Sequence, residues 1–137
     1  MHDRLRVGDL LRIAPPRNNF PVVEGAERSV FVAGGIGITP FIPLAVCLNQ
    51  LHRRWKLHYS VKTPDRAAHL DELQRLAGEG YGEVETNFDG RPGGRMIDLA
   101  GVIQALPPDA HVYCCGPEGM LDAFRRAASA LPVDRVH

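Results

Sequence analysis

The 137-residue sequence has few cysteines and no recognisable metal-binding spacing. Its three cysteines, of which Cys114 and Cys115 are adjacent, cannot form the disulfide framework of a small secreted domain. No Cys-x-x-Cys pair is present to hold zinc or an iron–sulfur cluster, and none of the six histidines falls in a His-Glu-x-x-His pattern. We therefore expect no metal site in this chain and a location in the reducing cytoplasm.

The sequence also lacks an excess of one charge and a long apolar run. Sixteen Lys and Arg side chains balance sixteen Asp and Glu side chains, so the basic footprint typical of nucleic-acid or anionic-membrane binding is missing. No segment approaches the ~20 apolar residues of a membrane span, and residues 1–9 lack the charged-then-apolar order of a signal peptide. The sequence therefore predicts a soluble, unexported protein with neither nucleic acid nor membrane as a partner.

Glycine and proline, by contrast, are abundant. The 14 glycines and 11 prolines exceed the roughly 12% share that these two residues take in an average chain. The length and the 45% hydrophobic content are typical of one globular domain with its own core. The excess therefore indicates many tight turns within a single domain.

Apolar periodicity predicts strands that alternate with helices. Residues 10–14 form a candidate strand, and the prolines and asparagines of residues 15–21 mark a linker. The pattern then predicts strands at residues 29–33, 55–61, 83–88 and 110–115, and helices at residues 39–51, 65–77, 98–106 and 117–131. This alternation is typical of a parallel sheet with helices on both faces, in which ligands bind beyond the carboxyl ends of the strands.

The first candidate site is the loop Ala33-Gly-Gly-Ile-Gly-Ile-Thr-Pro40. Its glycines would let the backbone approach a ligand, and the helix that follows would offer free N–H groups to a phosphate. We expect Thr39 to cap this helix by accepting from its first N–H groups, with Pro40 at the first helical position. The loop matches neither Gly-x-Gly-x-x-Gly nor a P-loop, so taken alone it is equally typical of an ordinary turn.

The second candidate site is Cys115-Gly-Pro-Glu-Gly-Met120. Gly116 and Pro117 would end a strand and start a helix, which would leave the Cys115 side chain at the mouth of the sheet. Taken alone, Cys115 is better explained as a small buried apolar residue.

Together the two loops resemble the nucleotide-binding domain of the ferredoxin–NADP reductase superfamily. The chain is most similar to the branch of phthalate dioxygenase reductase and vanillate O-demethylase oxidoreductase. That similarity rests on the first loop, on Leu57-His-Tyr-Ser60, on Asp109-Ala-His-Val-Tyr-Cys-Cys-Gly-Pro117 and on the lead-in Pro16-Arg-Asn-Asn-Phe-Pro21, and it covers residues 8–137. It implies a three-layer α/β/α fold with a five-stranded parallel sheet over residues 28–137. Residues 1–27 would be the last strand and exit linker of a flavin-binding β-barrel.

The resemblance also implies which residues bind the coenzyme. In that family NADH gives a hydride to a flavin, and Cys115 would lie near the reacting carbon of the nicotinamide ring as the catalytic residue. The residues expected to bind the nucleotide are Gly34, Gly35, Gly37, Thr39, Pro40, Ser60, Lys62, Arg66, Cys115, Gly116, Pro117 and Met120.

The segment from Ser60 to Arg66 is expected to meet the adenosine ribose. An acidic residue there favours the 2′-hydroxyl of NAD, and a basic one accommodates the 2′-phosphate of NADP. Lys62, Asp65 and Arg66 give mixed signals, and a role as solvated charges at a helix start stays open for Lys62 and Arg66. The resemblance favours NADH over NADPH.

The sequence departs from the family in lacking the Arg-x-Tyr-Ser/Thr segment that binds flavin phosphate. FMN or FAD and a [2Fe–2S] cluster are therefore expected only in an intact reductase, which would pass electrons from NADH to a Rieske-type aromatic oxygenase or demethylase. The alternative is a non-catalytic remnant that serves as a nucleotide-binding or protein-interaction module. Without a barrel the apolar residues 10–13 would be exposed, so a homodimer is a further expectation.

Overall fold

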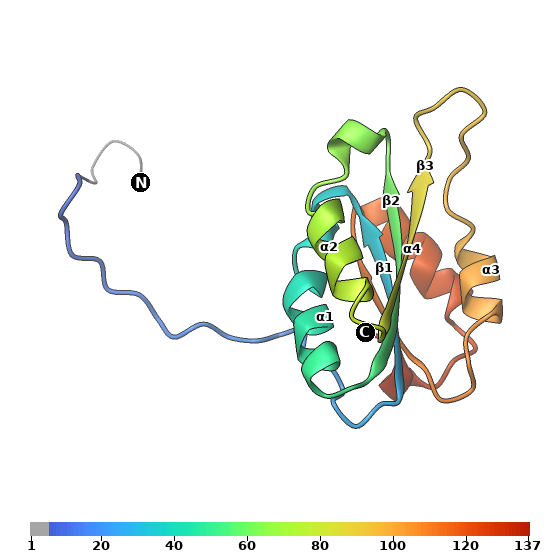
Figure 1. Cartoon of the computed structure of the whole chain (residues 1–137), viewed down its shortest axis with the longest axis horizontal. Coiled ribbons are helices and arrows are strands. Elements are labelled where there is room, and N and C mark those ends of the chain that lie inside the picture. The colour runs from blue at the N-terminus through green and yellow to red at the C-terminus, as the bar shows by residue number, and fades with distance from the viewer. Residues whose placement is uncertain (1–5) are drawn as a thin grey trace.

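The computed structural model describes residues 6–137, which form a twisted parallel sheet with helices on both faces (Figure 1). The strands are β1 (Arg28–Gly34), β2 (Arg54–Val61), β3 (Gly82–Phe88) and β4 (His111–Cys115). They lie in the order β3-β2-β1-β4, and every neighbouring pair is parallel. The predicted α/β class and the four strands of the alternating region are confirmed.

Two apolar cores lie on opposite faces of this sheet. The helices α1 (Phe41–Gln50) and α2 (Leu70–Ala77) cover one face, and α3 (Leu99–Gln104) and α4 (Glu118–Ala127) cover the other (Figure 1). In β1, Phe31 belongs to the first core and Val32 to the second, and both are fully buried. Burial of such a side chain contributes about 1.5–3 kcal/mol, which explains why the central strand is apolar on both faces.

A buried polar network joins the elements of the first core. Asn49 at the end of α1 accepts a hydrogen bond from the indole Nε1 of Trp55 at 2.7 Å. Its amide nitrogen donates to the Leu76 carbonyl at 2.8 Å and to the Glu79 carboxylate at 2.7 Å. The Asn49 side chain therefore links β2, through the Trp55 indole, to the end of α2, through the Leu76 carbonyl.

The predicted helices are shorter in the structure, and one is interrupted. Residues Gly35–Ile38 form a short 3-10 helix, η1, so that α1 begins only at Phe41. The predicted helix over residues 65–77 is divided into a 3-10 turn, η2 (Pro64–Arg66), and α2. The division falls at His69, whose φ of 59° lies in the left-handed region and cannot continue a right-handed helix.

The prediction of a five-stranded sheet is wrong: within the described residues the sheet has four strands. The fifth position, beside β4, holds only an isolated parallel bridge between Val112 and Val136. A third short 3-10 helix, η3 (Val133–Arg135), runs up to that position, and Val136 follows it in an extended conformation. His137 completes the bridge by donating to Val112 and accepting from Cys114, both at 2.9 Å.

The strand predicted at residues 10–14 is also absent from the structure. Residues 10–18 are irregular and exposed, and no strand formed by residues 6–137 lies beside them to pair with their backbone groups (Figure 1). The barrel remnant predicted for residues 1–27 is therefore not seen in the described part of that range, and residues 1–5 lie outside the described residues. No helix among residues 6–137 has the length and apolar character needed to cross a bilayer.

Tyr113 of β4 anchors the segment that leads into the domain. The Phe20 ring packs edge-on against Tyr113, with ring centroids 5.7 Å apart, and the Val23 N–H donates to the Tyr113 hydroxyl at 2.9 Å. The His137 ring stacks on the Tyr113 ring, with the ring centroids 4.3 Å apart. The segments before β1 and after η3 therefore converge on one side chain.

Candidate nucleotide-binding site

The two glycine loops meet at the carboxyl ends of β1 and β4. These strands are neighbours, and Ala33 pairs in register with Cys115. From β1 the chain proceeds to β2 on one side, whereas β4 lies on the other, so the strand order reverses between them. Such a switch point opens a crevice outside the strand ends, which is where α/β folds bind ligands.

The loops are packed so closely that glycine is required at their contact. A Cβ atom on Gly37 would overlap the carbonyl group of Cys115, and one on Gly34 would lie 2.8 Å from both Met120 Sδ and Pro117 Cδ. The structure thus brings the predicted residues Gly34, Gly37, Cys115, Gly116, Pro117 and Met120 together. Any side chain at Gly37 would push the loops apart.

Gly35 and Ile36 form the open surface of the first loop. Gly35 has φ +54°, and a Cβ built on it would meet no atom within 4 Å, so its backbone is accessible from outside. Ile36 is 82% exposed although it is large and apolar. Sequence reasoning missed Ile36, because only the structure shows that the loop turns this side chain outward at the crevice rather than into the core.

The predicted capping role of Thr39 is wrong. Its hydroxyl donates to the Ile36 carbonyl at 3.2 Å, and the residue that precedes the first helical residue is Pro40, which offers no side-chain cap. The extra 3-10 turn, η1, displaces the start of α1 by one residue and causes this difference. Without a side-chain cap, the N–H groups of the first turn of α1 lack their usual intramolecular acceptor.

Cys115 lies half-buried where the two loops touch. Its side chain packs against the core on the α1 side of the sheet, and burial raises the pKa of its thiol above the usual range. The thiol is therefore protonated and uncharged at neutral pH. Its neighbour Cys114 points into the other core, and burial raises its pKa to about 12.

The predicted ribose-binding residues lie one strand away. Ser60 pairs in register with Gly34, and its buried hydroxyl accepts a hydrogen bond from the Asn87 amide of β3 at 3.1 Å. Lys62 and Arg66 are exposed beyond the end of β2. The structure therefore places Ser60 beside the glycine crevice, with Lys62 and Arg66 farther along the chain towards α2.

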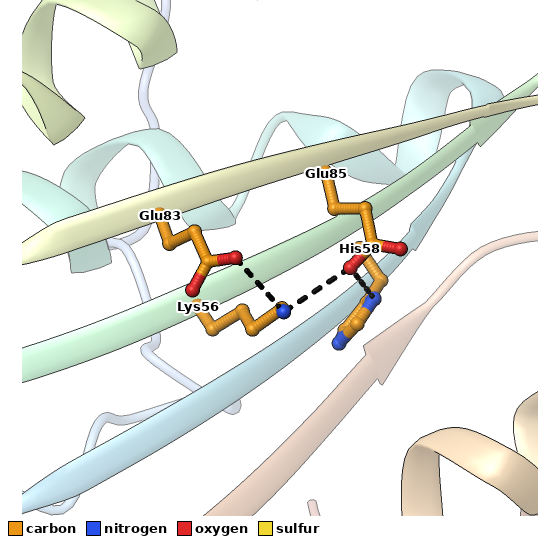
Figure 2. Close-up of polar contacts among 4 residues, drawn as sticks. All are labelled: Lys56, His58, Glu83 and Glu85. Atoms are coloured by element: carbon orange, nitrogen blue, oxygen red, sulfur yellow. Dashed lines mark hydrogen bonds and ion pairs between the residues drawn. The ribbon is translucent and has the colours of Figure 1, made fainter.

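A separate charged network lies on the α3 side of β2 and β3, away from the glycine loops (Figure 2). Lys56 Nζ lies 3.0 Å from Glu83 and 3.1 Å from Glu85, and His58 Nδ1 lies 3.3 Å from Glu85. Burial lowers the pKa of His58, so this side chain is neutral at pH 7. These residues line an open groove of about 780 Å³, but their charges are largely paired with one another.

Comparison with known proteins identifies the domain. The family described as the oxidoreductase NAD-binding domain matches residues 31–126. The chain belongs to this family. Within residues 6–137 no group of three or more His, Cys, Asp or Glu side chains is placed to hold a metal ion.

Similar curated proteins are reductases or components of oxygenase systems. This NAD-binding domain is 43% identical to tetrachlorobenzoquinone reductase of Sphingobium chlorophenolicum, over 99% of the chain and 42% of that protein. It is 38% identical to vanillate O-demethylase oxidoreductase of Pseudomonas sp. (strain HR199), over 88% of the chain and 38% of that protein. The chain spans about two fifths of the length of these relatives, and it is a member of an NAD(P)H-dependent oxidoreductase family.

Solved structures agree with the sequence comparisons. The NAD-binding domain superposes on phthalate dioxygenase reductase with a TM-score of 0.76 and 34% identity, over 89% of this chain and 38% of that one. It superposes on an intact type IV self-sufficient cytochrome P450 monooxygenase with a TM-score of 0.81 and 38% identity, over 99% of this chain and 17% of that one. The predicted branch of the ferredoxin reductase-like proteins is therefore confirmed.

Proposed function

We propose that this domain binds NADH and holds its nicotinamide ring for hydride transfer to a flavin carried by a neighbouring domain or subunit. The observation that carries the proposal is the contact between the Gly37 loop and the Cys115 backbone at the switch point. Two backbone loops in contact there would give the flat ring and pyrophosphate of a dinucleotide a fixed floor.

Residues of the first loop would bind the pyrophosphate of NADH, and residues of the second would contact its nicotinamide ring. The accessible backbone at Gly35 and the uncapped first turn of α1 suit the pyrophosphate, because N–H groups at a helix start attract anions. Cys115 and Gly116 would bound the nicotinamide ring, and the exposed Ile36 would exclude water from its other side. NADH supplies the hydride, while the protein supplies position.

The names of the relatives support the wider reaction sequence. Several belong to multicomponent oxygenases or demethylases, and one is a reductase that transfers electrons from pyridine nucleotides to a [2Fe–2S] cluster. We infer that this domain serves such a reductase, in which FMN or FAD and a [2Fe–2S] cluster pass electrons to a Rieske-type aromatic oxygenase or demethylase. Gly34, Thr39, Pro40, Pro117 and Met120 would shape the nucleotide site in that reductase.

Calorimetric titration of the chain with NADH tests the proposal. We expect binding by the wild type and a loss of affinity of at least about tenfold in Gly37→Ala, because the added methyl group must separate the two loops. Gly25→Ala is the matched control, since a Cβ there meets nothing within 4 Å, and it should bind like the wild type.

Two results would contradict this proposal. One is absence of NADH binding at millimolar concentration in a folded wild-type chain. The other is equal affinity in Gly37→Ala and Gly25→Ala. Oxidation of NADH after addition of free flavin would in turn exclude the alternative of a non-catalytic module.

A further inference from the structure

Two arginines stand side by side where β1 and β2 begin. Arg28 of β1 pairs in register with Arg54 of β2, and both side chains are exposed. Neighbouring strands lie about 4.8 Å apart, and residues paired in register point to the same face of a parallel sheet. Alternation along β1 puts Arg28 on the face of Val30, which belongs to the core under α3 and α4. Both arginines therefore emerge together on the α3 side of the sheet.

The positive charge of this arginine pair is not neutralised by its neighbours. Within residues 6–137 neither arginine makes an ion pair with a carboxylate. Glu27 borders the pair on its outer side without pairing with either, while Glu83 and Glu85 are engaged by Lys56. Like charges directly opposite each other on neighbouring strands are destabilising. An anion held between the two arginines would remove this repulsion.

An apolar wall reaches the same edge of the sheet. After β3 the chain turns back, and α3 returns it towards the amino ends of the strands (Figure 1). The Ala110 N–H donates to the Pro107 carbonyl at 3.1 Å, and the next residue, His111, pairs in register with Ser29. The chain that follows α3 therefore ends at the edge where β1 begins, beside the arginine pair.

The arginine pair and the apolar wall line one groove. It is the open groove of about 780 Å³ described above, which is within the size range of sites for small organic ligands. Arg135 donates from its guanidinium to the carbonyls of Ala110 at 2.9 Å and Pro107 at 3.1 Å, which fixes the turn at the end of the wall. The half-buried apolar side chains that line the groove are Ile97, Val102, Leu106 and Pro107.

The floor of the groove limits where negative charge can bind. Lys56 lies 3.0 Å from Glu83 and 3.1 Å from Glu85, so its charge is already shared between two carboxylates (Figure 2). The two glutamates would repel an anion placed over β3. An anionic group that enters the groove is therefore directed to the arginine end.

We propose that this groove binds an amphipathic organic anion, with its carboxylate or phosphate head between Arg28 and Arg54 and its apolar body along Val102 and Leu106. A planar guanidinium binds such a head with two parallel hydrogen bonds, and the paired arginines offer two of them. The apolar body would remove half-exposed apolar side chains from water. The arginines lie at the amino ends of the strands and the glycine crevice lies beyond their carboxyl ends, so the inference does not rest on the proposed function.

NMR titration of the chain, followed through its backbone amide signals, tests the groove. The probes are 4-phenylbutanoate, its neutral amide 4-phenylbutanamide, 3-phenylpropyl phosphate and acetate. We expect 4-phenylbutanoate to bind at least about tenfold more tightly than its amide, because the amide lacks the charge, and more tightly than acetate, which lacks the apolar body. The phosphate probe shows which of the two head groups the arginines prefer.

Two variants and a control locate the binding. Arg28→Gln and Arg54→Gln should each weaken binding of 4-phenylbutanoate at least about fivefold. Neither should lower the temperature of unfolding, because each removes a repulsion between like charges. Arg126→Gln changes an exposed arginine in the last turn of α4 and should bind like the wild type.

Four results would overturn the inference. The first is equal affinity for the acid and its amide, and the second is equal affinity for the acid and acetate. The third is equal binding of the acid by Arg28→Gln, Arg54→Gln and Arg126→Gln. The fourth is displacement of the acid by NADH, which would put the acid in the glycine crevice. Binding of the acid that depends on both arginines, in a chain that does not bind NADH, would support the groove and contradict only the proposed nicotinamide site.

Discussion

The two adjacent cysteines show how one residue type serves two environments. Strand alternation sends Cys115 to the glycine crevice and Cys114 into the core between the sheet and α4. Both thiols have raised pKa values because burial disfavours the thiolate. The pair therefore contributes packing at neutral pH, and neither residue needs a reactive sulfur for its place in the fold.

The raised pKa of the Cys114 thiol leads us to expect that the stability of the fold depends on pH. Its pKa is about 12 in the folded chain and ~8.5 when unfolded. Above pH 8.5 the unfolded chain loses a proton that the folded chain keeps, so the free energy of unfolding should decrease as the pH rises, with a contribution approaching ~1.4 kcal/mol per pH unit. Urea denaturation at pH 8, 9 and 10 should show a shallower decrease in Cys114→Ala.

Tyr59 and Tyr113 also have raised pKa values. Both tyrosines are present in the wild type and in Cys114→Ala, so their contributions to the pH dependence of stability cancel when the two are compared. A difference in stability between wild type and Cys114→Ala that stays constant from pH 8 to 10 would refute this assignment.

At the level of elements, Asn49 links α1, β2 and α2. Asn49→Ala would leave the Trp55 indole N–H buried without its partner, whereas the Leu76 carbonyl would keep the Glu79 N–H at 3.2 Å. Because an unsatisfied buried group costs about 1–3 kcal/mol, we expect a loss of about 1–3 kcal/mol in the free energy of unfolding. Chemical denaturation followed by the fluorescence of Trp55, the single tryptophan, measures this loss.

Asn19→Ala is the control for this experiment, because Asn19 is exposed in the segment before the domain, and its stability should match the wild type. Equal stability of the two variants would show that the network contributes nothing.

Local sequence signals predicted the strands and helices of this fold better than the boundaries and breaks of those elements. Apolar spacing and glycine placement were sufficient for the four strands and the two loops, because both depend on near neighbours in the chain. The break at His69 and the displaced start of α1 come from left-handed and 3-10 backbone conformations, which apolar spacing does not report. Asn49, by contrast, resembles an ordinary surface polar residue until the fold pairs it with Trp55.

At the scale of the whole molecule, the exposed apolar residues in the segment before β1 lead us to expect self-association. Leu10 and Ile13 are almost fully exposed, and apolar side chains exposed in a row favour contact with a second copy. Sedimentation should therefore show a dimer that weakens with dilution and is lost in the double variant Leu10→Ser, Ile13→Ser. Val133→Ser, which changes an equally exposed apolar residue elsewhere, should leave the dimer intact. A wild type that remains monomeric at high concentration would exclude this expectation.

The contacts of Tyr113 tie both flanking segments to β4. Phe20 and Val23 hold this residue from the side that precedes β1, and His137 holds it from the side that follows η3. Tyr113 lies two residues before Cys115 on the same strand. Both flanking segments are thus in contact with the strand whose carboxyl end borders the crevice, and Phe20 extends this contact to Phe41 at the start of α1.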